Sequence, residues 1–339
     1  MRNLVLAVLL LTTLLVAEAQ DAPSIPLDRF YTDRRGYPLR KILSKIHFSA
    51  STGFGKTYFK HILEGDMGIY QSPTRGPMLF IGTPVPTKGQ SQWIDTSTPA
   101  AINFNNATDF AVLGDTAKIG FKSKSFTIPL QLTAHFEFKQ KYRIGIGCGK
   151  DFIFVKPFKP IAYESKIESP DSVISFVSTN KWFLTGGYSF YRLDKFLFTG
   201  NVQVGLNKFG KNIDRGLAKS SPFFNLGVTV ERELSEYLQV FVRPSFEFKS
   251  YTLNLPDTQS QLKHKANAFT FQFGLTYSIP ELPKCKIKEC RIQMHHAHGD
   301  REYRSRAHPI WKKQNPAYGE NHPKPIQFKW WNRKKINAY

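Results

Sequence analysis

Seven charged residues stand at alternate positions in segments that are otherwise apolar or built from small side chains. They are Glu137, Arg143, Asp151, Glu231, Arg243, Glu247 and Lys249. Arg243 and Glu247 are four apart, so in an extended strand both point to one side, and residues of neighbouring strands could complete a network. Buried charges must be paired. We expect these residues to fill an interior structurally. A gated pore, or a proton or ligand site, is the alternative.

A second group of reactive side chains lies near the C-terminus. Cys285 and Cys290 precede His295, His296 and His298. Cysteine pairs of exported proteins usually form disulfides, and we predict a disulfide between Cys285 and Cys290. A Cys/His metal site is the alternative, but the spacing is not that of a standard zinc motif. We therefore predict no metal and no cofactor.

Sequence motifs of catalysis give no candidate residues. No nucleophile elbow, P-loop, zincin or paired-carboxylate motif stands at a credible structural position. We therefore predict no catalytic residue and no enzymatic activity. A lipid-modifying enzyme is a third alternative, but His135 and Ser189 lie on the polar face of their segments, which weakens it.

The N-terminus indicates export. Arg2 precedes an apolar run from Leu4 to Ala17, and Ala17-Glu18-Ala19 fits a signal-peptidase site. We predict a signal peptide over residues 1–19 and a mature chain that starts at Gln20. Mean hydropathy is −0.34, and no later stretch approaches the ~18 apolar residues of a spanning helix. Any membrane residence must therefore use another architecture.

Period-2 alternation of apolar and polar residues dominates the chain and predicts β-strands. One face of these segments carries bulky apolar side chains, including 16 of the 29 Phe and four of the 14 Tyr, and the other carries mainly Gly, Ser, Thr, Asn and Gln. Eight segments show the pattern: Ile46–Tyr58, Phe126–Phe138, Tyr142–Phe154, Trp182–Phe190, Phe196–Leu206, Phe224–Glu231, Leu238–Lys249 and Ala268–Ile279.

The connections between these segments alternate in length. Short turns lie near Lys139–Lys141, Asp194 and Ser235–Glu236, and long loops join the other pairs. Such alternation is typical of outer-membrane barrels. We predict an all-β fold: an eight-stranded antiparallel up-and-down transmembrane β-barrel over residues 45–280. In the first long loop, Met78–Ile81 and Phe110–Leu113 could form an extra hairpin.

A membrane barrel and a soluble barrel differ in whether the apolar face of the strands points outward or inward. A soluble eight-stranded barrel also alternates, but its polar face meets water and is densely charged. Here the polar face has few charges and small side chains, as suits a narrow lumen, whereas the apolar face is bulky and aromatic. This favours the membrane barrel, with outer-membrane lipids around it.

The last predicted strand carries a pattern of polar, x, Gly, x, x, aromatic, x, hydrophobic residues at Gln272, Gly274, Tyr277 and Ile279. This pattern resembles the assembly signal of bacterial outer-membrane barrels. The chain is thus similar to the small OmpA- and OmpX-like barrels, which implies an outer-membrane location. Cleavage before Gln and a C-terminal extension suggest a Bacteroidota-type member.

The C-terminal tail, residues 281–339, departs from that resemblance. It holds 14 Lys+Arg and five Asp+Glu, five prolines and no clear periodicity, so we predict an irregular basic tail. An even strand number places it in the periplasm with the N-terminal segment, residues 20–44. We expect Trp330, Trp331, Arg333, Lys334 and Lys335 to contact lipid headgroups or a protein partner.

Function follows from charge and compartment together. A formal charge of +21 suggests nucleic acid as partner, but export makes that improbable, and we predict none. We predict an outer-membrane anchor or assembly component of an envelope complex that binds a periplasmic or outer-membrane protein through its tail. A narrow channel or ligand-binding barrel is the alternative.

Overall fold

The computed structural model describes residues 36–305. The gaps in this range are 64, 83–84, 92–96, 117, 140, 171–174, 194–195, 211–212, 214–215, 220, 256–260 and 293. The predicted signal peptide and the predicted contact residues Trp330, Trp331, Arg333, Lys334 and Lys335 lie outside the described residues.

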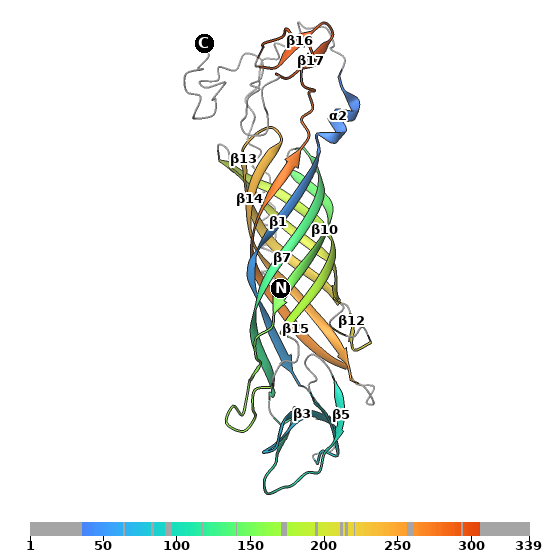
Figure 1. Cartoon of the computed structure of the whole chain (residues 1–339), viewed down its shortest axis with the longest axis vertical. Coiled ribbons are helices and arrows are strands. Elements are labelled where there is room, and N and C mark those ends of the chain that lie inside the picture. Colours follow the sequence, from blue (N-terminus) through green and yellow to red (C-terminus); the bar gives the residue numbers. More distant parts are fainter. Residues whose placement is uncertain are drawn as a thin grey trace, which may run out of the picture.

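Eight long antiparallel strands form a closed ring (Figure 1). The ring closes because β1 (Ile46–Ile62) pairs with β15 (Gln261–Ser278) on one side and with β7 (Gly120–Phe138) on the other. The other five strands are β8 (Tyr142–Phe154), β10 (Phe176–Leu193), β11 (Phe196–Phe209), β13 (Ser221–Glu233) and β14 (Leu238–Asn254). The predicted all-β antiparallel fold is confirmed, and each predicted strand lies on one strand of this ring. Several strands continue further toward the long loops than predicted. Their outward face turns from aromatic residues to lysine there, so the apolar alternation on which the prediction rests ends before the strand does.

The first long loop is folded into a sheet of its own, of order β5-β4-β3-β2-β6. Its strands are β2 (Met67–Ser72), β3 (Arg75–Ile81), β4 (Lys88–Ser91), β5 (Thr98–Ala101) and β6 (Phe110–Leu113). The predicted hairpin between residues 78–81 and 110–113 is wrong, because β3 and β6 both pair with β2. Two further short strands, β9 (Lys159–Pro160) and β12 (Ala218–Lys219), extend the ring at β7 and β14.

The C-terminal segment is not irregular throughout, which corrects the prediction. Strands β16 (His296–His298) and β17 (Arg301–Tyr303) form a hairpin beyond the end of β15. Gly299 has φ of 59°, which suits the first central position of a two-residue hairpin turn. Strands this short are not visible as a periodicity in the sequence.

Helix is rare: α2 (Pro38–Leu43) precedes β1 at the same end of the ring as β16 and β17 (Figure 1). No helix in the described part of the chain is long and apolar enough to cross a membrane.

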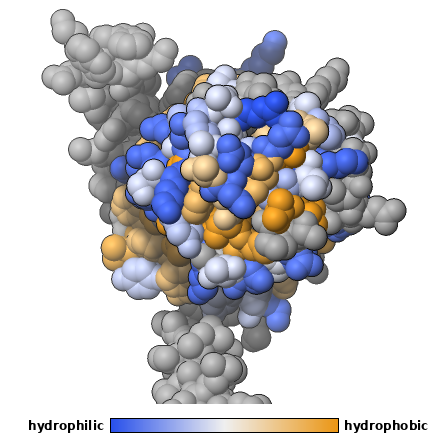
Figure 2. Space-filling view, turned by 90° about the horizontal axis from the view of Figure 1, so that it is seen from below, coloured by the Kyte–Doolittle hydropathy of each residue, from blue (hydrophilic) through white to orange (hydrophobic). Residues whose placement is uncertain are grey.

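The hydrophobic core lies inside the loop end of the barrel. Phe59, Phe121 and Phe158 pack there with Ile69 and Leu79 of the loop sheet, and all five are buried. The barrel interior and the loop sheet thus share one core. Figure 2 looks onto this end, where hydrophilic side chains are interspersed with hydrophobic ones.

Candidate functional site

The barrel lumen holds two ion-paired clusters, of which the first lies near the short turns. We call it the arginine cluster. Arg143 on β8 donates from Nε to Glu137 of β7 at 2.9 Å and from Nη1 to Glu231 of β13 at 2.5 Å. Because β8 and β13 are not neighbours in the ring, the Arg143–Glu231 bond crosses the lumen. His47 and His135 stack beside this cluster with ring centroids 5.2 Å apart.

The second cluster, the lysine cluster, lies further toward the loop end. Lys181 Nζ on β10 is 2.5 Å from Asp151 Oδ2 on β8 and 2.6 Å from Glu247 Oε2 on β14. Lys249 Nζ is 3.1 Å from the same Asp151 oxygen and 2.9 Å from Glu247 Oε1. All four residues are at most 5% exposed. Two cations and two anions make the cluster neutral, which is what burial of charge requires.

Arg243 lies apart from both clusters. It donates from Nη2 to Asn225 Oδ1 at 2.7 Å. Four residues of a strand span about 13 Å, so Arg243 and Glu247 share a face without touching, and each finds partners on other strands. The structure therefore places all seven sequence-predicted charges at the lumen, in two clusters and one separate arginine.

Three lumen residues were missed by the sequence analysis. Lys181 continues the inward alternation of Thr185, Gly187 and Ser189 by two steps, so a longer window would have found it. His61 and His264 are fully buried at the loop end, with ring centroids 3.8 Å apart. Their strands extend past the predicted ends, which is why the pattern missed them.

Little space is left in the lumen. A cavity of about 60 Å³ lies beside the arginine cluster, lined by residues such as Ser49, Gln131, Thr185 and Gln272. This volume holds a few water molecules. On the loop side of the lysine cluster, the apolar core that the barrel shares with the loop sheet fills the barrel. Ion-paired and apolar side chains thus occupy much of the described barrel interior.

The outer wall carries two bands of aromatic side chains with aliphatic ones between them. Near the turns, Tyr142 stacks on Phe138 at 5.2 Å and meets Tyr188 at 5.4 Å between ring centroids. Near the loops, Phe154 meets Phe126 at 6.2 Å and Phe176 at 5.5 Å. On the aliphatic band between them, large side chains are widely exposed: Ile144 62%, Ile146 64%, Leu132 60%, Leu184 65%. This order is that of the lipid-facing surface of transmembrane barrels.

The height of this surface fits a membrane. Tyr142 and Phe154 stand at the two ends of β8. Twelve residue steps at about 3.3 Å, tilted by about 40°, rise about 30 Å, close to the thickness of a hydrocarbon core.

A row of lysines lies beyond the loop-side aromatic band. Lys60 of β1 is in register with Lys265 of β15 and with Lys122 of β7, and all three are exposed on the outer wall. Like charges directly opposite one another destabilise a sheet, so this row needs anionic neighbours or water.

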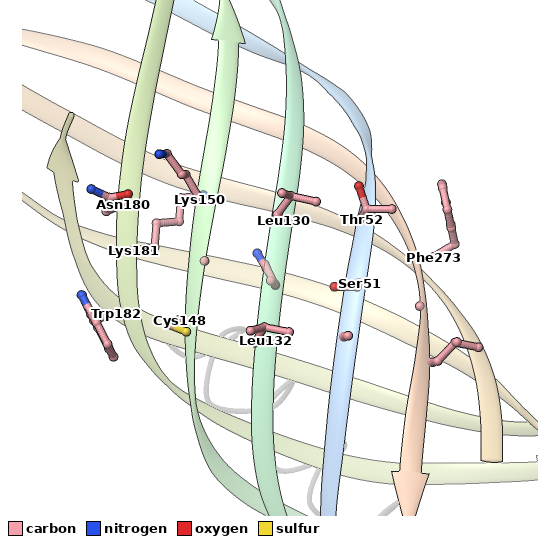
Figure 3. Close-up of a pocket in the computed structure, with 15 residues that line it drawn as sticks. Ser51, Thr52, Leu130, Leu132, Cys148, Lys150, Asn180, Lys181, Trp182 and Phe273 are labelled. Atoms are coloured by element: carbon pink, nitrogen blue, oxygen red, sulfur yellow. The ribbon is translucent and has the colours of Figure 1, made fainter. Parts of the chain in front are cut away.

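A hollow of about 850 Å³ lies on the outer wall (Figure 3). Its lining includes the small side chains of Ala50, Thr52 and Cys148 and the large ones of Trp182 and Phe273.

The residues of the predicted assembly signal lie at the turn end of β15. Gln272 is buried in the lumen, and Tyr277 on the outer wall stacks on Tyr237 at 5.8 Å. Gly274 lies where a Cβ would be 2.4 Å from the Ala50 carbonyl oxygen and 2.6 Å from the Phe241 ring. Ile279 directly follows the strand.

The segment after β15 is docked on the turn end of the barrel. Arg304 donates to Glu236 Oε2 at 3.2 Å and to the Tyr237 hydroxyl, and its guanidinium lies 4.6 Å from the Tyr237 ring centroid. Arg40 of α2 donates to the carbonyl oxygens of Pro280 at 3.0 Å and Leu282 at 3.1 Å. The chain ahead of β1 and the chain after β15 are thus held together.

A tyrosine pair adds to this docking. Tyr37, next to α2, meets Tyr303 of β17 edge-on, with ring centroids 6.3 Å apart. Burial raises the pKa of the Tyr37 hydroxyl to about 12. The Tyr37 hydroxyl therefore stays uncharged at physiological pH.

Comparison with known proteins gives structural neighbours alone. No protein family and no curated protein matches the sequence. The outer-membrane protease OmpT from Escherichia coli matches over 70% of this chain and 97% of its own, with 12% identity and a TM-score of 0.32. The outer-membrane protein AlkL matches over 73% and 94%, with 15% identity and a TM-score of 0.33. OprG from Pseudomonas aeruginosa matches over 68% and 94%, with 8% identity and a TM-score of 0.31. These neighbours are outer-membrane proteins.

The neighbours correct one expectation. The sequence analysis predicts no enzymatic activity, but an outer-membrane protease is among the matching structures. The prediction, which rested on the absence of familiar catalytic motifs, is therefore wrong as it was stated. The likeness itself assigns no activity to this chain.

Proposed function

We propose that the protein is an outer-membrane barrel that anchors an envelope complex through its C-terminal segment. The two aromatic bands and the aliphatic band between them support the membrane placement. The long loops and the loop sheet would face outside, and α2, β16 and β17 would face the periplasm. Eight barrel strands also support a relationship to the small OmpA- and OmpX-like barrels.

The filled lumen favours an anchor over a channel. Two ion-paired clusters cross the lumen, and the apolar core closes the loop end. An eight-stranded barrel has room for little more than its own side chains. A ligand-binding or conducting barrel would need space that these side chains occupy.

The docked segment is the observation that carries the proposal. Arg304 and Arg40 fix residues 280–304 against the barrel, so the chain leaves the barrel from a defined position. The 34 residues that follow, 306–339, contain eight Lys and Arg and one Glu. A strongly basic chain held at a membrane surface suits an acidic protein partner or the anionic headgroups of the inner leaflet.

Truncation tests this proposal. The full chain and a chain that ends at Pro280 are expressed in the native envelope, crosslinked and purified. We expect both to insert and to show heat-modifiable gel migration, and only the full chain to carry the crosslinked partner. If the shortened chain retains every partner, the anchor function is wrong.

A further inference from the structure

Four potential metal ligands meet in the docked C-terminal segment. Sγ of Cys285, Sγ of Cys290 and ring nitrogens of His296 and His298 all lie within 4.8 Å of one another. Cys285 and His296 are 3% and 5% exposed. The chain's three cysteines are all among the described residues, and none of them is in a disulfide. The structure thus differs from the disulfide predicted from the sequence.

Two of the Cys–His distances in this cluster fit one central ion. Cys285 Sγ is 3.5 Å from His298 Nε2, and Cys290 Sγ is 3.2 Å from His296 Nε2. In a tetrahedral zinc site, bonds of about 2.3 Å to sulfur and 2.0 Å to nitrogen place ligand atoms of the two kinds about 3.5 Å apart.

The orientation of His296 is that of a ligand. Its Nδ1 lies 2.9 Å from the carbonyl oxygen of Met294. A carbonyl oxygen only accepts, so Nδ1 carries the hydrogen, and the lone pair is on Nε2, the atom that faces Cys290. Metal-bound histidines usually donate their other ring N–H to such a carbonyl or carboxylate group.

Backbone pairing brings the ligands together from separate parts of the segment. Cys285 donates its N–H to Arg304, and Arg304 donates its own to Pro283, so the Cys285 strand lies beside the end of β17. His296 and His298 lie two residues apart on β16, so both side chains are on one face of the hairpin. Cys290 is held by a turn in which its N–H bonds to Ile287.

The segment has almost no hydrophobic core of its own. Cys285 is the one residue between 281 and 305 in the buried hydrophobic core of the described chain. Units this small usually need a metal, disulfides or a partner to fold.

We propose that Cys285, Cys290, His296 and His298 bind one Zn²⁺ ion in a structural site that holds the C-terminal segment in its docked form. Two thiolates and two neutral imidazoles complete a tetrahedral shell without an open position. Binding releases the two thiol protons. The site lies at one end of the hairpin that carries Arg304, so the zinc would fix the strand that contacts the barrel.

Metal analysis of the full chain in detergent tests the site. We expect about one zinc per chain in the wild type and less than a tenth of that in Cys285→Ser and in His298→Ala. Cys148→Ser, a thiol on the outer wall, and His295→Ala, a histidine outside the cluster, are the matched controls and should retain the zinc. Heat-modifiable migration of every variant shows that the barrel is folded.

A second measurement does not depend on variants. Chelation followed by Co²⁺ alone should give the visible absorption of tetrahedral cobalt with a thiolate charge-transfer band, and added Zn²⁺ should abolish it. An octahedral cobalt spectrum overturns the proposal. So does a Cys285–Cys290 disulfide found by peptide mass mapping of the unreduced, alkylated protein, and so does zinc that persists in Cys285→Ser.

Discussion

Replacing Lys181 by Met tests whether the lumen is dry and ion-paired. The substitution keeps the length of the side chain and removes one of the two cations that neutralise Asp151 and Glu247, which lie 2.5 and 2.6 Å from Lys181 Nζ. Lys249 alone then faces two carboxylates. Breaking a buried ion pair by removing one partner costs about 3–5 kcal/mol, and we expect a loss of this size in the free energy of unfolding.

A double substitution separates charge imbalance from loss of packing. In Lys181→Met with Glu247→Gln, Asp151 and Lys249 remain as a pair 3.1 Å apart. We therefore expect the double variant to recover about 1 kcal/mol or more relative to Lys181→Met. Urea unfolding in detergent micelles, followed by heat-modifiable gel migration, measures all variants on one scale.

Lys150 provides the matched control. It lies next to Asp151 on β8 but points to the outer wall, where its Nζ is 5.4 Å from the Phe152 ring centroid. A lysine on the lipid face costs stability, by about 0–4 kcal/mol with depth, so Lys150→Met should be neutral or stabilising. A loss below about 1 kcal/mol for Lys181→Met, or an equal loss for Lys150→Met, would refute a dry, paired lumen.

Three further predictions concern assembly, closure and docking. Gly274→Leu should strongly reduce the inserted, heat-modifiable fraction, because the new Cβ would lie 2.4 Å from the Ala50 carbonyl oxygen. Gly186→Leu is the control, because no atom lies within 4 Å of a Cβ at Gly186. Equal insertion of the two variants would contradict the prediction. The wild-type barrel should show no steady conductance in planar bilayers, since its lumen is filled, and solute-dependent current would instead support a channel. Arg304→Ala should expose residues 281–305 to limited proteolysis while the barrel stays heat-modifiable, because the contacts with Glu236 and Tyr237 are lost; unchanged protease resistance would show that Arg304 does not hold the segment.

The barrel was predictable because lipid and lumen impose opposite demands on alternate residues. Eight segments such as Ala268–Ile279 show this directly, and the inward positions of charges such as Glu247 follow from the same alternation. Lys181 obeys the same rule, but it directly precedes Trp182, where the predicted strand begins. The partners of each charge were not predictable, because they come from strands across the lumen.

The loop sheet and the C-terminal segment were not predictable from periodicity. β4 and β5 have four residues each, and β16 and β17 have three, so each is too short to show a repeat. The Cys/His cluster has a spacing unlike known zinc motifs, because backbone pairing of Cys285 with Arg304 brings its ligands together. A sequence motif reveals a metal site only when the ligands are close together in the sequence, on one local turn.

Photo-crosslinking from a single position tests the anchor function most directly. Arg301 is exposed on β17, at the end of the barrel assigned to the periplasm, and Thr98 is exposed on β5 at the opposite end. A photoreactive amino acid at Arg301 should yield a specific protein adduct in intact cells, and the same residue at Thr98 should not yield that adduct. If position 301 is instead labelled from outside the cell by a membrane-impermeant reagent, or forms no protein adduct, the C-terminal segment is not a periplasmic anchor.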